Sequence, residues 1–224
     1  MAFSVVPVIL TCEAEFAVTR KFTASFCNVQ HVLKPPIILI DQSASPRLSS
    51  EYLAAVASMA PSAVYIHPPE PGMSRYDSVQ EAANLALDWA FRNSVEDDYI
   101  LFLEDDIVFS SHFPDKAVNT YLGPETGFLT LYAPGDGYGF HIVDPSRFYG
   151  TQCVLFTRKA VEEIVHERCE MMGNFLPGYD IRWSRFLAYK GYVLYCTDHS
   201  YVQHQPVCSR LHGHGSHTSN RFLP

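Results

Sequence analysis

The sequence contains no long hydrophobic run, and this absence excludes a transmembrane helix. No apolar stretch approaches the roughly 20 residues that a helix needs to cross a bilayer. The N-terminus also has no basic segment before its first apolar stretch, as a signal peptide would require. We therefore expect a cytoplasmic protein without a membrane span.

Positive charge is scarce as well. The 16 lysines and arginines are outnumbered by 24 acidic residues, which gives a formal net charge of −8. A protein that binds nucleic acid needs a basic surface to contact the phosphate backbone. We therefore expect no nucleic-acid partner.

Cysteine pairs of the CxxC type are absent too, which argues against a zinc site. The six cysteines are widely scattered, and we expect small buried thiols rather than disulfides. They are Cys12, Cys27, Cys153, Cys169, Cys196 and Cys208.

What the sequence does contain, in its first half, is an alternation of apolar strands and amphipathic helices. Because Pro7 has no N–H to donate, full pairing of the first strand should begin at Val8. The alternation predicts an α/β fold, with one domain over residues 1–224 and a mostly parallel sheet that has helices on both faces. Strands are expected at residues 5–11, 37–40, 63–66 and 99–103, and helices at residues 14–29, 48–59 and from an N-cap at Ser78 to about residue 90.

The second half of the sequence is less regular. We expect strands near residues 128–131 and 149–156, and helices at residues 158–166 and from Asp180 to about residue 189. Between the two strands lies a glycine-rich loop at residues 132–139. Such a loop is expected to turn tightly or to move over a binding site.

Three consecutive acidic residues, Glu104-Asp105-Asp106, follow the apolar run at residues 99–103. If this run is a strand buried on both faces, these carboxylates lie at its C-terminal end, where open α/β sheets bind ligands. Thr11 and Asp41 end two other strands at the same edge. The triplet is either a solvated acidic turn or a ligand site. Because carboxylates this close repel one another, a divalent metal with a phosphate ligand is the interpretation that we favour.

Asp180 and a group of histidines are further candidates. Asp180 precedes a helix, so its carboxylate could cap that helix, act as a catalytic base, or do both. Five of the ten histidines lie after residue 198, and at least one of them could supply an imidazole to the metal. His204 is best placed, at the end of a strand. The others could close over a bound phosphate or have no role; they include His212, His214 and His217.

The order of these segments resembles the GT-A fold glycosyltransferases, nearest to the N-acetylglucosaminyltransferase I type. The resemblance covers about the first 125 residues: the strand at residues 8–12 and a helix with Arg20, the segment 36–42, the segment 98–106 with its DxD-like EDD triplet, and Phe113. Further on, residues 178–180 resemble the general-base segment of that family, and residues 202–204 resemble the segment that places a histidine near the metal.

The resemblance implies a Rossmann-like domain with a nucleotide-sugar-binding half at residues 1–110 and an acceptor and catalytic half at residues 111–224. It also implies an inverting glycosyltransferase that uses Mn²⁺ or Mg²⁺. The donor would be a nucleotide-diphosphate sugar, a UDP-sugar in particular, and the acceptor a glycan, a glycoconjugate or a protein. The sequence is shorter than the Golgi members and lacks their membrane anchor, so we expect a soluble enzyme of bacterial or viral type.

Roles for single residues also follow from the resemblance. Asp106 and His204 would bind the metal, and Asp180 would be the general base that gives inversion. The nucleotide sugar would be contacted by Thr11, Cys12, Arg20, Asp41, Asn84, Glu104 and Asp105, of which Asp41 would accept from the base imide and Asn84 could instead be an ordinary helix-surface residue. Phosphate or acceptor contacts would come from Tyr132, His212, His214 and His217.

Two other functions fit part of the pattern. A metal-dependent nucleotidyltransferase would need a glycine-rich, basic phosphate loop after the first strand, but residues 12–15 are acidic and contain no glycine. A catalytically silent module that binds carbohydrate or metal would be marked by loss of the metal carboxylate, whereas Asp106 is present. If Asp180 is only a cap, the base would be Asp136 or Asp144, or the mechanism would be retaining.

Overall fold

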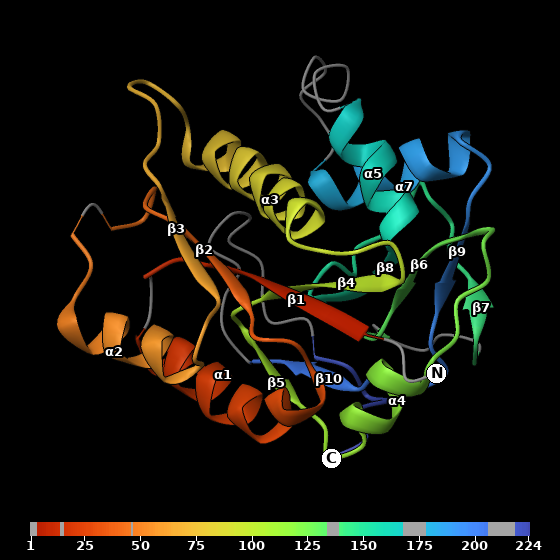
Figure 1. Cartoon of the computed structure of the whole chain (residues 1–224), viewed down its shortest axis with the longest axis horizontal. Coiled ribbons are helices and arrows are strands. Elements are labelled where there is room, and N and C mark those ends of the chain that lie inside the picture. Colours follow the sequence, from red (N-terminus) through yellow and green to blue (C-terminus); the bar gives the residue numbers. More distant parts are fainter. Residues whose placement is uncertain (1–3, 14–15, 46, 134–138, 168–177, 206–217) are drawn as a thin grey trace.

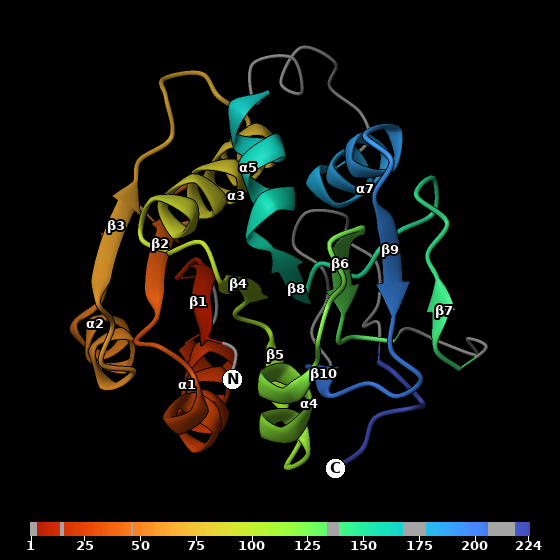
Figure 2. The same ribbon diagram turned by 45° about the vertical axis from the view of Figure 1, so that its right-hand side comes forward.

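A mixed β-sheet forms the centre of the molecule. The computed structural model describes residues 4–13, 16–45, 47–133, 139–167, 178–205 and 218–224. Within these residues, eight strands form one sheet in the order β3-β2-β1-β4-β8-β6-β9-β7 (Figures 1 and 2). They are β1 Ser4–Thr11, β2 Ile37–Asp41, β3 Ala63–His67, β4 Asp98–Glu104, β6 Thr126–Thr130, β7 His141–Ile142, β8 Cys153–Thr157 and β9 Val193–Cys196. A separate antiparallel pair is formed by β5 Ile107–Phe109 and β10 Val202–His204.

The first half of the sheet is parallel, as predicted from the alternation of strands and helices. β1 lies between β2 and β4, and β3 pairs with the outer side of β2. Pairing of β1 with β2 begins at Val8, as expected from the missing N–H of Pro7. Pairing with β4 begins earlier, at Ser4, so the prediction about Pro7 holds for one neighbour only.

The second half departs from a parallel sheet. β8 is antiparallel to both β4 and β6, β6 and β9 are parallel, and β7 is antiparallel to β9. The prediction of a mostly parallel sheet is therefore correct for the first half and incomplete for the second. β8 also begins at Cys153 rather than near residue 149, because residues 151 and 152 form a turn. β5, β7 and β9 were not predicted.

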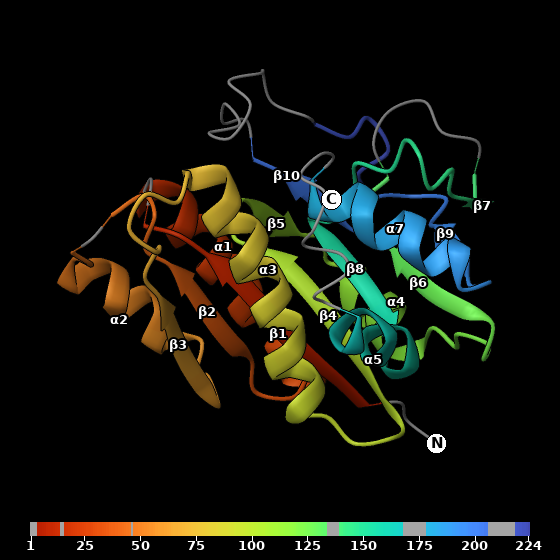
Figure 3. The same cartoon turned by 90° about the horizontal axis from the view of Figure 1, so that it is seen from above.

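Helices cover both faces of the sheet, as predicted (Figures 1 and 3). One face carries α1 Phe16–Val29, α2 Ser50–Ser58 and α4 Phe113–Asn119, and the other carries α3 Arg75–Arg92, α5 Arg158–His166 and α7 Tyr179–Tyr189. None of the helices in the described ranges has the length and hydrophobicity that a membrane crossing requires. Of the cysteines in these ranges, all free thiols, Cys153 and Cys196 are buried as expected and Cys12 and Cys27 only half-buried.

β4 is buried on both faces, and its alternation sets the direction of the acidic residues that follow. Phe102 packs in the core on the α3, α5 and α7 side, and Leu103 packs in the core on the α1 and α2 side. Successive side chains on a strand point to opposite faces. Glu104 and Asp105 continue this alternation into the edge of the sheet.

Helix α3 begins one turn earlier than the sequence predicted. Its N-cap is Ser74, whose hydroxyl oxygen accepts from the backbone N–H of Asp77 at 3.1 Å. Ser78, the predicted cap, lies inside the helix and donates its hydroxyl to Asp41 Oδ1 at 2.7 Å. Both serines precede a helical stretch, and the tertiary contact with β2 decides between them.

Asp98→Asn is expected to lower the free energy of unfolding by about 2 kcal/mol at neutral pH. Asp98 begins β4, and its carboxylate accepts from Lys34 Nζ at 2.8 Å on both oxygens and from the Val95 N–H at 2.8 Å. Lys34 is 40% exposed, so solvent screens part of this attraction. Burial raises the pKa of Asp98, but the hydrogen bonds from Lys34 and Val95 lower it below its ordinary value of 3.8.

The contribution of Asp98 to the free energy of unfolding should therefore be complete above pH 3.8. It should be lost as the pH falls through the lower pKa that Asp98 has in the folded state. Urea unfolding of wild type and Asp98→Asn at neutral and acid pH measures this. The difference between them should shrink toward acid pH. Asp97→Asn, at the exposed neighbouring carboxylate, is the matched control. Equal loss of stability in both variants would contradict the role of the Lys34 contact.

Candidate functional site

The three acidic residues lie at the carboxyl edge of the sheet. Glu104 is the last residue of β4, and Asp105 and Asp106 form the turn that leads into β5. Glu104 is in register with Leu10 of β1, so Thr11 at the end of β1 lies beside the triplet. The predicted edge is therefore present, and each carboxylate has different neighbours.

Asp105 is held by hydroxyl groups from β1 and α1, and a hydroxyl from α2 contacts the first of these. Its Oδ2 accepts from Thr11 Oγ1 at 2.5 Å and from Thr19 Oγ1 at 3.3 Å. Thr11 Oγ1 also lies 2.8 Å from the Tyr52 hydroxyl. Because Thr11 has one proton and gives it to Asp105, Tyr52 must donate to Thr11. Burial, with the charge of Asp106 in addition, raises the pKa of Asp105 to about 7 against the lowering effect of Thr11, Thr19 and the Cys12 backbone.

Glu104 is held from the opposite face of the sheet. Its Oε1 accepts from the hydroxyl of Tyr179 on α7 at 2.6 Å and from Thr151 Oγ1 at 2.7 Å. Burial and then the charge of Asp106 raise the pKa of Glu104 to about 7, although both hydroxyls favour the charged form. Two neighbouring carboxyls with raised pKa values cost folding free energy at neutral pH, and such costs are concentrated at functional sites.

Asp106 faces a histidine. Its Oδ2 lies 3.0 Å from Nε2 of His204, at the end of β10. The two residues meet because β5 and β10 pair, with His204 opposite Ile107, and because the Gln205 N–H donates to the Asp106 carbonyl at 2.7 Å. Of the histidines proposed as metal ligands, His204 is thus placed beside the triplet.

The contacts of His204 restrict where its protons can be. Nδ1 lies 2.8 Å from the Gln205 carbonyl oxygen, which can only accept, so Nδ1 carries a proton. Nε2 then faces Asp106 either as the second N–H of an imidazolium or as a lone pair, which would need a proton on Asp106 or a cation between the two atoms. Burial lowers the pKa of His204, but the hydrogen bond to Asp106 and the charges of Asp106 and Glu104 outweigh it and raise that pKa.

Asp106 and His204 could hold a divalent cation. Two ligands about 2.1 Å from a metal at a right angle are about 3.0 Å apart, and the 3.0 Å between His204 Nε2 and Asp106 Oδ2 is also the length of a direct hydrogen bond. Asp106 Oδ1 is buried and has no hydrogen-bond partner within the described residues. Within the same residues, no group of three or more histidine, cysteine or acidic side chains is placed to hold a metal. Asp106 and His204 would thus supply two ligands.

The proposed nucleotide contacts from the first strands and α1 differ in position. Cys12 hydrogen bonds to Asp105 through its backbone. Asp41 is 1% exposed and accepts from the Ser78 hydroxyl and from the backbone and hydroxyl of Ser43, so it is not open to a nucleotide base in this arrangement. Arg20 is exposed on α1, and its neighbour Thr19 is the residue that reaches Asp105.

Two predictions about side chains near α7 need correction. Asp180 is not the N-cap of α7, because the helix begins at Tyr179 with Gly178 as its cap residue. Asp180 lies in the first turn and accepts from the Ile181 N–H at 2.8 Å. Asn84 is not on the helix surface. It is buried and accepts from Trp183 Nε1 at 2.9 Å, so it ties α3 to α7.

The remaining candidates lie in the second half of the chain. The Tyr132 side chain is buried, and burial, followed by the charge of Asp106, raises its pKa to about 12. Asp144 is exposed and is bonded by the hydroxyl and N–H of Ser146. His212, His214, His217 and Asp136 lie outside the described residues.

The hydroxyl groups that hold the triplet were not found from the sequence. They belong to Thr19, Tyr52, Thr151 and Tyr179, which come from three helices and a turn. Only Tyr179 carried a usable signal, because it precedes Asp180 in the segment already considered catalytic. The others are polar residues whose partners depend on the folded arrangement.

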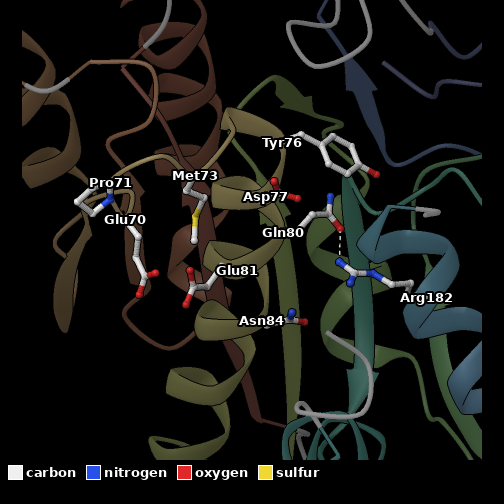
Figure 4. A pocket seen from close by; sticks show the side chains of 9 residues that line it. All are labelled: Glu70, Pro71, Met73, Tyr76, Asp77, Gln80, Glu81, Asn84 and Arg182. Carbon is white, nitrogen blue, oxygen red and sulfur yellow. Dashed lines mark hydrogen bonds between the residues drawn. The ribbon is translucent and has the colours of Figure 1, made fainter. Parts of the chain in front are cut away.

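A pocket of about 330 Å³ lies along α3, next to α7 and the β3–α3 loop (Figure 4). Its described lining contains neither the triplet nor Asp180, but Asp180 lies near two of the residues that line it. A Cβ added to Gly178 would lie 3.0 Å from Asp180 Oδ1, 3.3 Å from the Tyr76 hydroxyl and 3.7 Å from Gln80 Nε2, and Tyr76 and Gln80 line the pocket. The described residues that line it are Glu70, Pro71, Met73, Tyr76, Asp77, Gln80, Glu81, Asn84 and Arg182.

Comparison of the sequence with known proteins adds no assignment. No protein-family model matches the chain, and no curated protein is significantly similar to it.

Proposed function

We propose that this chain is a metal-dependent glycosyltransferase of the GT-A type, which transfers a sugar from a nucleotide-diphosphate donor, such as a UDP-sugar, to an acceptor hydroxyl with inversion. The observation that carries the proposal is the arrangement at the end of β4. Three adjacent carboxylates lie at the ligand-binding edge of the sheet, and Asp106 faces His204 at 3.0 Å. Such a concentration of negative charge favours a cation and, through it, a diphosphate.

Asp106 and His204 would hold Mn²⁺ or Mg²⁺, and the diphosphate would complete the coordination. The cation would offset the negative charge that develops on the departing nucleotide diphosphate. Glu104 and Asp105 directly precede Asp106 and are each fixed by hydroxyl groups, on opposite faces of the sheet. This rigidity would keep the donor in one orientation.

Asp180 would take the proton from the acceptor hydroxyl. The acceptor oxygen then bonds to the anomeric carbon of the donor, while the bond from that carbon to the diphosphate oxygen breaks and its electron pair leaves with the diphosphate. Tyr179, the neighbour of Asp180, donates to Glu104, so the first turn of α7 is fixed to the end of β4. This contact supports the placement of a base beside the donor site.

Mn²⁺ is expected to increase the affinity for UDP by at least about tenfold. The cation would offset the negative charge of the triplet, and the diphosphate would complete the coordination of the cation. Isothermal titration calorimetry of UDP with Mn²⁺ and with a chelator measures this coupling. A panel of nucleotide sugars tested for Mn²⁺-dependent hydrolysis would then identify the donor. Equal UDP affinity in both buffers would remove the metal-bridging role from Asp106 and, with it, the proposed function.

A further inference from the structure

The pocket beside α3 differs in chemistry from a diphosphate site. Among the described residues that line it, the carboxylates of Glu70, Asp77 and Glu81 and the guanidinium of Arg182 give a formal charge of −2. Glu70 and Glu81 lie at one end and Arg182 at the other (Figure 4). A pocket with this balance repels phosphates and other anions. It is therefore unsuited to the nucleotide donor.

The same lining suits a ligand rich in hydroxyl groups. Carboxylates accept hydrogen bonds, and the amides of Gln80 and Asn84 can donate and accept. Pro71, Met73 and Tyr76 add apolar surface against which the carbon skeleton of a small ligand can pack. The volume of about 330 Å³ is at the lower end of the range of about 300–1,000 Å³ for small-molecule sites.

The pocket is also held in shape by hydrogen bonds between α3 and α7. Arg182 donates to Gln80 within the pocket, as Figure 4 shows, and Trp183 donates to Asn84 at its wall. Residues 179, 182 and 183 thus connect one side of α7 to β4 and α3. A site built on packed helices in this way needs little rearrangement to bind a ligand.

The position of Asp180 connects this pocket to the reaction. Asp180 Oδ1, the Tyr76 hydroxyl and Gln80 Nε2 all lie within 4 Å of one point beside Gly178. We propose that the pocket binds the acceptor, as a neutral or cationic polyhydroxylated group such as a sugar residue, with a hydroxyl directed toward Asp180. This inference rests on the proposed glycosyltransferase function and extends it to the acceptor class.

Saturation-transfer NMR with methyl glycosides and no donor present tests the pocket. The probes are the methyl glycosides of glucose, galactose, mannose and N-acetylglucosamine, cationic methyl glucosaminide and anionic methyl glucuronide. We expect signals from at least one neutral or cationic glycoside and none from the glucuronide. Met73→Trp, which fills the pocket, should reduce those signals at least about fivefold. Leu53→Trp, at a 43% exposed leucine on α2, is the matched control and should reduce none.

Glu70→Lys provides a second variant at an exposed loop position, where folding should be unaffected. It should weaken binding of the glucosaminide and admit the glucuronide. Signals that are absent for every neutral and cationic glycoside, or that survive unchanged in Met73→Trp, would overturn the inference. UDP binding without glycoside binding would leave the proposed function standing without this acceptor site. Glycoside binding without UDP binding would remove the transferase and, with it, the acceptor role of the pocket.

Discussion

Asp106→Asn is expected to weaken Mn²⁺-dependent binding of UDP by about 100-fold, because an amide oxygen replaces the charged ligand that faces His204. Folding without metal should survive, since the charge of Asp106 raises the pKa of both Glu104 and Asp105 and its loss relieves that repulsion. Calorimetry of the variant measures UDP binding, and thermal unfolding of the same variant measures the stability of the fold without metal.

Asp97→Asn is the control for this experiment. Asp97 is an exposed carboxylate just before β4, at the end of the strand opposite Asp106. The Asp97→Asn substitution removes the same charge from the chain without changing the triplet. UDP binding that keeps its full dependence on Mn²⁺ in Asp106→Asn would show that Asp106 holds no metal.

Asp180→Asn is expected to lower the rate of sugar transfer by about 100-fold or more at saturating donor, because an amide cannot take the acceptor proton. Stability should change little, since an asparagine Oδ1 can still accept from the Ile181 N–H in the first turn of α7. UDP affinity should also be unchanged, because the nucleotide contacts lie on other elements. Transfer assays and thermal unfolding together measure this separation of rate from stability.

The comparison variant for Asp180 is Asp115→Asn, which removes the acidic residue from the first turn of α4. Both substitutions take one negative charge from a helix start, where it is favourable. Only Asp180→Asn should slow transfer. A wild-type rate for Asp180→Asn would give Asp180 a structural role alone, and the base would have to be sought elsewhere.

Much of the first half of the fold could be predicted from hydrophobic periodicity. α1 ends at Val29 as predicted, and β2 and β4 each end one residue beyond the predicted ranges. β5 and β7 escaped prediction because strands of two or three residues carry almost no periodic signal. Antiparallel pairing of β8 depends on contacts far away in the sequence, which local patterns do not specify.

The candidate site, like the fold, could be predicted only in part. The carboxylates were found because three charges next to a buried strand are conspicuous in a sequence. Most of their hydroxyl partners were missed because Thr19 and Asp105, for example, are 86 positions apart. The capping prediction for Asp180 failed by a small shift in helix start, and helix boundaries are the least certain part of a sequence-based prediction.

The short β5–β10 pair has a consequence for the order of folding. It joins residue 106 to residue 204, which lie almost at opposite ends of the second half of the chain, so closing this contact costs loop entropy that local pairs do not incur. During synthesis, β1 to β4 can associate long before β10 leaves the ribosome. The Asp106–His204 pair is therefore completed only when the C-terminal segment docks, and its formation reports that the whole chain has folded.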